Sequence, residues 1–221
     1  MSPYRKFSTS FVIVFFFASA CSSPVPKNKW QHDAAGFCHD YQEHFLQGKD
    51  LRAKLDLSHA KKSATQSAQL KTLIDIELTV CAMKISNLDT TACPKAEELL
   101  TIEPEPSQSA YLDLMRSQPT TQSQAYLPSQ YQDFAKALSS QDSLKINQSL
   151  SSIEPLSSRL LASSLSREYI NTKNIQELIN ALSYRGYKKP LLSWLAFQMN
   201  AEQDPHEKAR LKAKIDVLTS N

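Results

Sequence analysis

Glycine is nearly absent from this sequence: only Gly36, Gly48 and Gly186 occur among 221 residues. Tight hairpin turns, dinucleotide-binding loops and phosphate-binding loops all depend on glycine. Its scarcity therefore excludes the Gly-rich nucleotide and phosphate motifs. Leu, Ala, Lys, Gln, Glu and Ser dominate instead, which favours an all-α protein whose breaks fall at Pro, Asn and Asp.

Residues 21–221 carry no strong excess of positive or negative charge. The whole chain carries 25 Lys plus Arg against 22 Asp plus Glu, a formal net charge of +3. Residues 1–20 contain Arg5, Lys6 and no acidic residue, so the remaining chain keeps 23 basic residues and a net charge of +1. Nucleic-acid binding rests on a strong basic excess. We therefore expect no nucleic-acid partner.

The N-terminal segment contains the parts of an export signal in the usual order. Arg5 and Lys6 form a positive region, residues 11–17 are apolar, and residues 18–21 read Ala-Ser-Ala-Cys. The apolar run is far shorter than the ~20 residues of a transmembrane helix. The segment resembles a bacterial lipoprotein signal peptide ending in a lipobox. An ordinary secretory signal, cut before the same residue, is the alternative interpretation.

The resemblance implies that residues 1–20 are removed and that Cys21 becomes the acylated first residue. Two or three acyl chains are enough for stable anchoring to a membrane. Ser22 resembles the outer-membrane sorting signal of Gram-negative lipoproteins. We therefore expect a lipid-anchored protein on the periplasmic side of the outer membrane, with residues 21–30 as a tether that reaches about 30 Å.

Residues 31–221 are expected to form one α-helical domain. Apolar residues recur at spacings of three and four most clearly over 66–86. Four prolines fragment residues 102–130, where we expect an irregular segment with a short helix near 109–117. A capping-box pattern, Ser129-x-x-Gln132, indicates the next helix start. The other expected helices span 31–47, 50–62, 93–100, 129–138, 142–152, 155–170, 174–185, 189–202 and 205–219.

The later helix starts recur weakly, every 31 to 34 residues. A helix pair every ~34 residues is the spacing of tetratricopeptide repeats. Residues 181–194 resemble a helix–loop–helix of that kind, although the small and aromatic positions of the repeat do not recur in the neighbouring units. The sequence therefore predicts an array of antiparallel helix pairs, either tetratricopeptide-like or an irregular helical bundle.

Three cysteines remain besides Cys21, namely Cys38, Cys81 and Cys93. The expected compartment is oxidising, so we expect one disulfide and one free thiol. Cys81 and Cys93 flank the connection between two helices, which favours a Cys81–Cys93 bridge with Cys38 as a buried thiol. Cys38–Cys81 is the rival pairing.

Titratable residues gather in the segment 32–44, but their spacing does not fit a known site. The run His39-x-x-x-Glu43-His44 misses a zinc motif by one residue, which turns His44 about 140° away from His39. Residues 35–39 read Ala-Gly-Phe-Cys-His, whereas haem attachment normally uses Cys-x-x-Cys-His. We expect neither a metal nor another cofactor.

Catalytic motifs are not recognisable either. The chain has no Gly-x-Ser-x-Gly elbow and no recognisable Ser-x-x-Lys acylation set. Paired acids such as Glu97-Glu98 are typical of a solvated surface or a helix start. We expect a protein without enzyme activity. A cell-wall hydrolase or a ligand-binding lipoprotein acting in the periplasm is the alternative.

In the last expected helix, Leu211, Ile215 and Leu218 form one narrow apolar stripe. This stripe predicts a terminal helix packed on the preceding helices. A helix that binds a membrane surface or a partner is the alternative.

The leading hypothesis is a protein-interaction or assembly module of the cell envelope. Helical arrays present extended grooves to protein partners. Tyr184, Tyr187 and Trp194 are our candidates for the edge of such a groove, and core packing is the alternative role for each.

Overall fold

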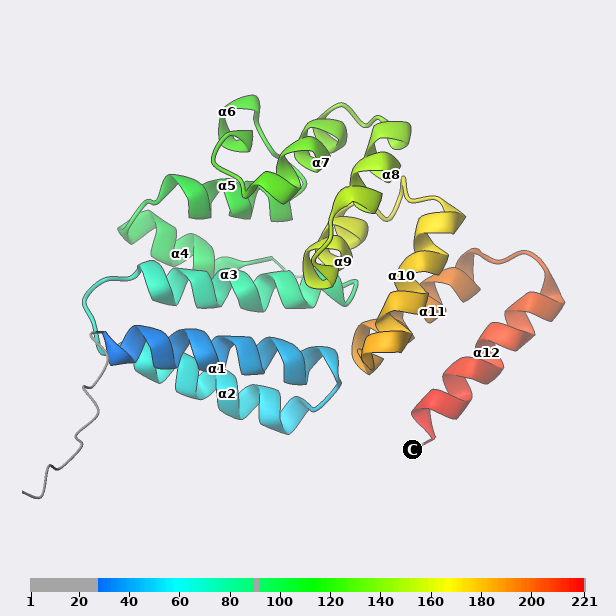
Figure 1. Cartoon of the computed structure of the whole chain (residues 1–221), viewed down its shortest axis with the longest axis horizontal. Coiled ribbons are helices and arrows are strands. Elements are labelled where there is room, and N and C mark those ends of the chain that lie inside the picture. The colour runs from blue at the N-terminus through cyan, green and yellow to red at the C-terminus, as the bar shows by residue number, and fades with distance from the viewer. Residues whose placement is uncertain (1–27, 90–91, 221) are drawn as a thin grey trace, which may run out of the picture.

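A computed structural model describes residues 28–89 and 92–220 (Figure 1), so the signal-like segment and Cys21 lie outside the described residues. Within these two ranges the chain is all-helical and contains no strand. The twelve helices are α1 (Lys29–Leu46), α2 (Asp50–Ala64), α3 (Lys71–Ser86), α4 (Pro94–Ile102), α5 (Pro106–Met115), α6 (Thr121–Gln124), α7 (Ser129–Ser139), α8 (Ser143–Ser152), α9 (Leu156–Leu165), α10 (Thr172–Arg185), α11 (Lys188–Ala201) and α12 (Pro205–Thr219).

The first two helices, α1 and α2, form a hairpin with the most extensive contact between any two helices (Figure 1). Small side chains explain its closeness: Ala60 and Ala64 of α2 are buried against Ala34 and Cys38 of α1. Helix axes approach most closely where the side chains between them are small. Ile76 of α3 seals this small cluster from the side.

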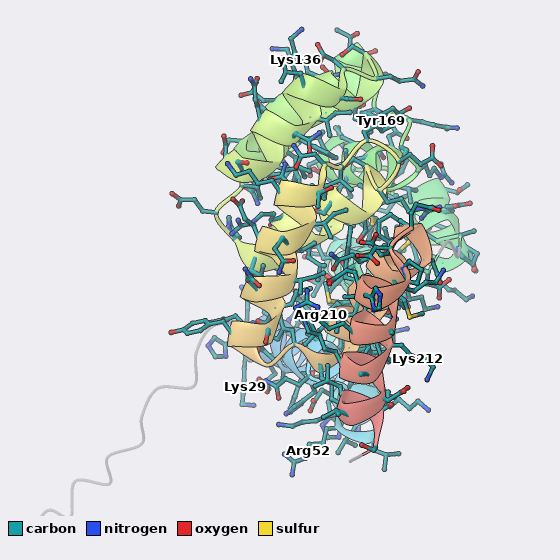
Figure 2. The ribbon with its side chains drawn as sticks, turned by 90° about the vertical axis from the view of Figure 1, so that its right-hand side faces the viewer. Lys29, Arg52, Lys136, Tyr169, Arg210 and Lys212 are labelled. Atoms are coloured by element: carbon teal, nitrogen blue, oxygen red, sulfur yellow. A yellow bond between two sulfur atoms is a disulfide. The ribbon has the colours of Figure 1, made fainter. Side chains whose placement is uncertain are left out.

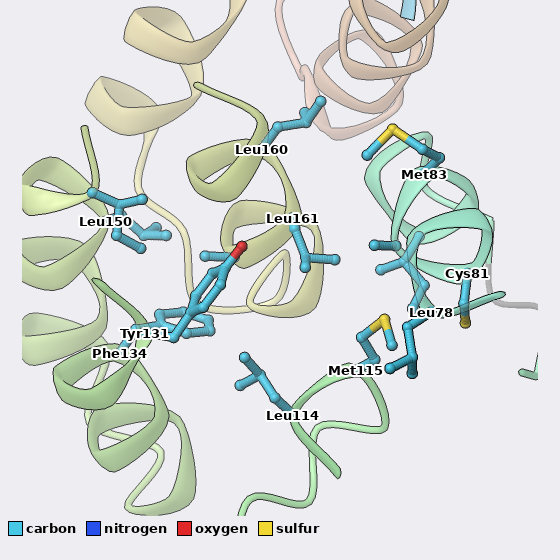
Figure 3. Packing of buried hydrophobic residues seen from close by; sticks show 14 of the residues in the cluster. Leu78, Cys81, Met83, Leu114, Met115, Tyr131, Phe134, Leu150, Leu160 and Leu161 are labelled. Carbon is cyan, nitrogen blue, oxygen red and sulfur yellow. The ribbon is translucent and has the colours of Figure 1, made fainter. Parts of the chain in front are cut away.

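Helix α3 is the centre of the fold, since it contacts α1, α2, α4, α5 and α9. Its apolar residues lie on several sides, as expected for a helix that is buried all round. Figure 3 shows Leu78 of α3 beside Met115 of α5, with Met83 farther along α3 and with Leu160 and Leu161 of α9 opposite α3. All five side chains belong to one continuous core.

Helices far apart in the sequence also meet, because α1 contacts α11. The Tyr187 hydroxyl donates a hydrogen bond of 2.7 Å to Glu43 Oε1. The Lys189 ammonium lies 2.7 Å from Asp50 Oδ1 and 4.2 Å from the centroid of the Phe45 ring. We call these five residues the α1–α11 clasp. In a linear repeat array each unit touches only its neighbours, so the clasp is a contact that such an array would lack.

The predicted all-α array of packed helix pairs is confirmed. Each predicted helix has a counterpart in the structure, while the four-residue helix α6 was not predicted. The predicted capping box at Ser129 and Gln132 is wrong, because Pro128 occupies the N-cap position of α7 and no side chain caps that helix. A capping box forms instead between Thr120 and Ser123 at the start of α6.

The proline-containing stretch 102–130 is more regular than expected. It contains α5 and α6, and Pro106 occupies the first turn of α5. A helix tolerates proline at this place, because the first backbone N–H groups have no partner within the helix. The prolines therefore separate short helices here and do not prevent them.

Several helices end in a left-handed residue that closes the last turn. At the end of α7, for example, the N–H of Gln141 bonds the carbonyl of Leu138 at 3.1 Å, and the N–H of Asp142 bonds that of Ala137 at 3.1 Å. Because glycine is scarce, three such positions carry side chains. The left-handed residues that follow α1, α3, α5, α7 and α10 are Gly48, Leu88, Ser117, Gln141 and Gly186, with φ of 77°, 63°, 57°, 52° and 69°.

The exposed members of this set yield a stability prediction. Ser117→Gly and Gln141→Gly should each raise the free energy of unfolding by about 0.5–1 kcal/mol, because glycine removes the Cβ clash of the left-handed conformation. Urea unfolding followed by circular dichroism measures the change. Gly186→Ala is the control and should lower stability by about 1 kcal/mol. Lower stability of both glycine variants would contradict this description of the helix ends.

Candidate functional site

A polar groove between α3, α5, α7 and α9 is the candidate site. It contains an open hollow of ≈ 470 Å³, within the size range of ligand sites. A separate, smaller cavity of ≈ 110 Å³ is lined by Gln42 and Thr79 among others. Both cavities have Tyr111, Tyr131 and Ser158 in their walls. We call the candidate site the tyrosine groove and define it by Asp75, Gln108, Tyr111, Tyr126, Tyr131 and Ser158.

Two stacked tyrosines form the middle of the tyrosine groove. The ring centroids of Tyr111 and Tyr131 are 5.8 Å apart and the rings are tilted by 43°. The two hydroxyls lie close enough to influence each other's pKa, and Ser158 lies beside Tyr131 in the groove wall. Figure 3 shows Tyr131 reaching from α7 toward the helix that carries Leu161. Burial raises the pKa of both phenols above the ordinary value, so both stay neutral.

Gln108 carries the least satisfied polar group of the groove. Its side chain is buried, with 4% of its surface exposed. Both amide hydrogens are used, because Nε2 donates to the Lys71 carbonyl at 2.9 Å and to Asp75 Oδ1 at 2.6 Å. The remaining Oε1 is buried and has no hydrogen-bond partner among the described residues. A buried acceptor without a partner costs about 1–3 kcal/mol, which a ligand donor would recover.

Asp75 adds a carboxylate beside this amide. Partial desolvation raises the pKa of Asp75, while the hydrogen bond from Gln108 and the charge of Lys71 act in the opposite direction. The carboxylate still reaches solvent. The groove thus combines hydroxyls, an amide oxygen and a carboxylate, a set suited to hydrogen bonding with a polar chain.

The aromatic residues expected at a groove edge lie elsewhere, and two of the three are in the core. Tyr184 is exposed, with 91% of its surface accessible, at the end of α10. The prediction is wrong for Tyr187 and Trp194, which are buried. Trp194 packs edge-on against Phe197 with centroids 5.4 Å apart, and Tyr187 belongs to the α1–α11 clasp. The helix faces that carry Tyr187 and Trp194 were expected to contact a partner, but neighbouring helices cover them.

The predicted disulfide is confirmed. Cys81 of α3 is bonded to Cys93, the N-cap residue of α4, with Cα atoms 5.6 Å apart. Cys38 is the free thiol and is buried, as predicted. Burial raises the pKa of the Cys38 thiol, which keeps it protonated.

Glu43 and His44 of α1 have structural partners. Glu43 accepts the hydrogen bond of the clasp, and His44 Nδ1 lies 2.6 Å from Asp56 Oδ2 of α2. Within residues 28–89 and 92–220, no group of three or more His, Cys, Asp or Glu residues converges as metal ligands do.

A larger hollow of ≈ 680 Å³ lies where the carboxyl ends of α3, α5, α7 and α9 meet. Its wall includes the ion pair between Arg116 and Glu97, with N and O 2.5 Å apart. None of its described lining residues carries a buried polar atom without a partner. The tyrosine groove is therefore the better candidate site.

The structure reveals groove residues that sequence reasoning missed, above all Gln108, Tyr111 and Tyr131. A usable signal was present, because Tyr111, Tyr126 and Tyr131 fall within a short stretch of the chain. Tyr111 and Tyr131 were placed on expected helices, but no local pattern indicated that these two helices bring the rings together.

Comparisons with protein-family models, curated proteins and solved structures find no match. The class of protein therefore follows from the fold and the groove: an all-α array of packed helix pairs with a hydrogen-bonding groove between them. In the part of the chain that the structure describes, no helix has both the length and the apolar character needed to cross a membrane.

Proposed function

We propose that this chain is a lipoprotein held at the periplasmic side of the outer membrane through Cys21, and that its helical domain binds a segment of a partner protein without catalysing a reaction. The resemblance of residues 1–23 to a lipoprotein signal supports the anchor. The buried, unpartnered Gln108 Oε1 within the tyrosine groove carries the binding proposal.

A peptide segment fits the chemistry of this groove. Each residue of an extended chain offers one N–H donor and one C=O acceptor. Gln108 Oε1 can accept from such a donor, and the hydroxyls of Ser158 and the tyrosines can serve as donors or acceptors. Tyr126 is exposed at the rim. Tyrosine is enriched at protein interfaces because it joins an apolar ring to a polar tip.

Photo-crosslinking in cells tests the groove. A photoreactive residue replacing Tyr126 should give a reproducible adduct with one envelope protein. The same replacement at the exposed Tyr184 is the matched control and should not give this adduct. Tyr131→Phe removes only the groove hydroxyl, and should lower the Tyr126 adduct several-fold because a hydrogen bond contributes ~1 kcal/mol. Equal adducts from both positions would reject the groove as the binding site.

Adding purified cell-wall fragments to the crosslinking experiment tests the ligand-binding alternative. Loss of the adduct on adding fragments that bind the groove would favour a ligand-binding lipoprotein.

Membrane fractionation tests the anchor. The Cys21→Ser variant should leave the membrane fraction, since it lacks the acylated sulfur. If this variant stays membrane-bound like the wild type, the anchor proposal is wrong.

A further inference from the structure

The outer face of α2 carries two leucines that no described residue covers. Leu51 is 84% exposed and Leu55 is 55% exposed. Residues four apart share one side of a helix, so these side chains lie together, while Ala53 and Ala60 bury the opposite side. Single exposed leucines are ordinary, whereas adjoining apolar side chains with a polar rim mark a contact surface.

Basic residues surround this leucine pair. By the helical period, Lys62 continues the stripe of Leu51 and Leu55, while Arg52 and Lys54 flank it on either side. None of these three cations pairs with a carboxylate among the described residues. Their long stems can lie along an apolar layer while the charged heads reach anionic groups.

The carboxylates of α2 do not offset this charge. Asp50 is paired with Lys189, and Asp56 with His44, at 2.7 and 2.6 Å. The uncompensated charge on the outer face of α2 is therefore positive.

Helix α2 forms the lower boundary of the molecule in Figure 1. We define the α2 edge by Leu51, Arg52, Lys54, Leu55 and Lys62.

The length of chain between Cys21 and α1 limits how far the domain can lie from the anchoring point. Helix α1 begins at Lys29, so only residues 22–28 lie between the helix and Cys21. At ~3.5 Å per residue this segment spans at most about 28 Å. Figure 1 shows α1 beginning beside the carboxyl end of α2, and Figure 2 shows Lys29 and Arg52 both in the lower part of the molecule.

From these observations we propose that the α2 edge lies on an anionic lipid surface, with Leu51 and Leu55 inserted among the headgroups and Arg52, Lys54 and Lys62 bound to lipid phosphates. The inference rests on the proposed function in that the anchor brings the edge to the membrane. Insertion of apolar side chains and attraction of basic ones to anionic lipid act together at such surfaces. The domain then has a fixed orientation, with α5 to α7 directed away from the membrane (Figure 1).

Vesicle co-sedimentation of the mature chain carrying Cys21→Ser tests the proposal without the lipid. This chain should bind vesicles of phosphatidylethanolamine and phosphatidylglycerol, and bind much less to phosphatidylcholine. The double variant Leu51→Ser/Leu55→Ser should reduce the partition coefficient by about tenfold or more. Arg52→Ala/Lys54→Ala should also reduce it by about tenfold, and should flatten its salt dependence.

Leu144→Ser is the matched control, because Leu144 is 70% exposed on α8, away from the α2 edge. It should bind vesicles like the parent chain, and circular dichroism should show all variants to be folded. Binding of the Leu51→Ser/Leu55→Ser chain equal to that of Leu144→Ser overturns the proposal. So does a Cys21→Ser chain that does not bind the vesicles of phosphatidylethanolamine and phosphatidylglycerol. Because the test uses neither lipid anchor nor partner, its failure leaves the anchor and groove proposals standing.

Discussion

Trp194→Ala should lower the free energy of unfolding by about 3–5 kcal/mol, the range for removing a large aromatic side chain from a core. Trp194 is fully buried on α11, where it packs against Phe197. Alanine would leave a cavity that the surrounding helices can only partly fill. Urea unfolding followed by circular dichroism measures the loss independently of the tryptophan signal.

Tyr184→Ala is the natural control for this variant, since its side chain is almost fully exposed. Its effect should stay within about 0.5 kcal/mol, as for surface substitutions in general. Trp194→Phe should fall between the two, because it retains most of the ring and removes the indole N–H, which has no described partner. A loss below about 1 kcal/mol for Trp194→Ala would contradict the core position of this residue.

Removing the disulfide is expected to have the second large effect. Cys81→Ala/Cys93→Ala should lower the free energy of unfolding by about 3 kcal/mol, because the bridge closes a loop with a sequence separation of 12 and restricts the unfolded chain. Urea unfolding of the wild type with and without dithiothreitol should show a similar difference, whereas the double variant should not respond to the reductant.

Cys38→Ala separates the bridge from the free thiol. This variant should keep the full response to dithiothreitol, since Cys38 takes no part in the bridge. A wild-type protein whose stability is the same in both redox conditions would argue against a contribution from the Cys81–Cys93 bond.

Much of the helical architecture was predictable, because local patterns specify it. The spacing of apolar residues in α3 and the prolines at the starts of α4 and α12 indicated helices that the structure contains. Helix α6 was missed because four residues are too few for a periodic pattern. At the end of α3, Leu88 adopts a left-handed conformation that a glycine would normally mark, so this turn had no sequence signal.

The candidate site was much less predictable, because contacts between distant residues create it. Gln108 meets Asp75 across 33 positions of the chain. Whether its amide faces solvent or a groove depends on how α5 packs against α3, which no local pattern encodes. The same reason explains the error at Trp194 and Tyr187: an aromatic residue on a helix gives the same sequence pattern whether another helix or a partner covers it.

The α1–α11 clasp has a kinetic consequence. Its hydrogen bond joins Tyr187 to Glu43 across 144 positions, and contacts of such long range form slowly because a long loop must close first. The α1–α2 hairpin can form early, but it cannot reach its final neighbour until α11 is in place. Interactions that form after the folding transition state mainly govern the unfolding rate. We therefore expect the clasp to affect the unfolding rate more than the folding rate.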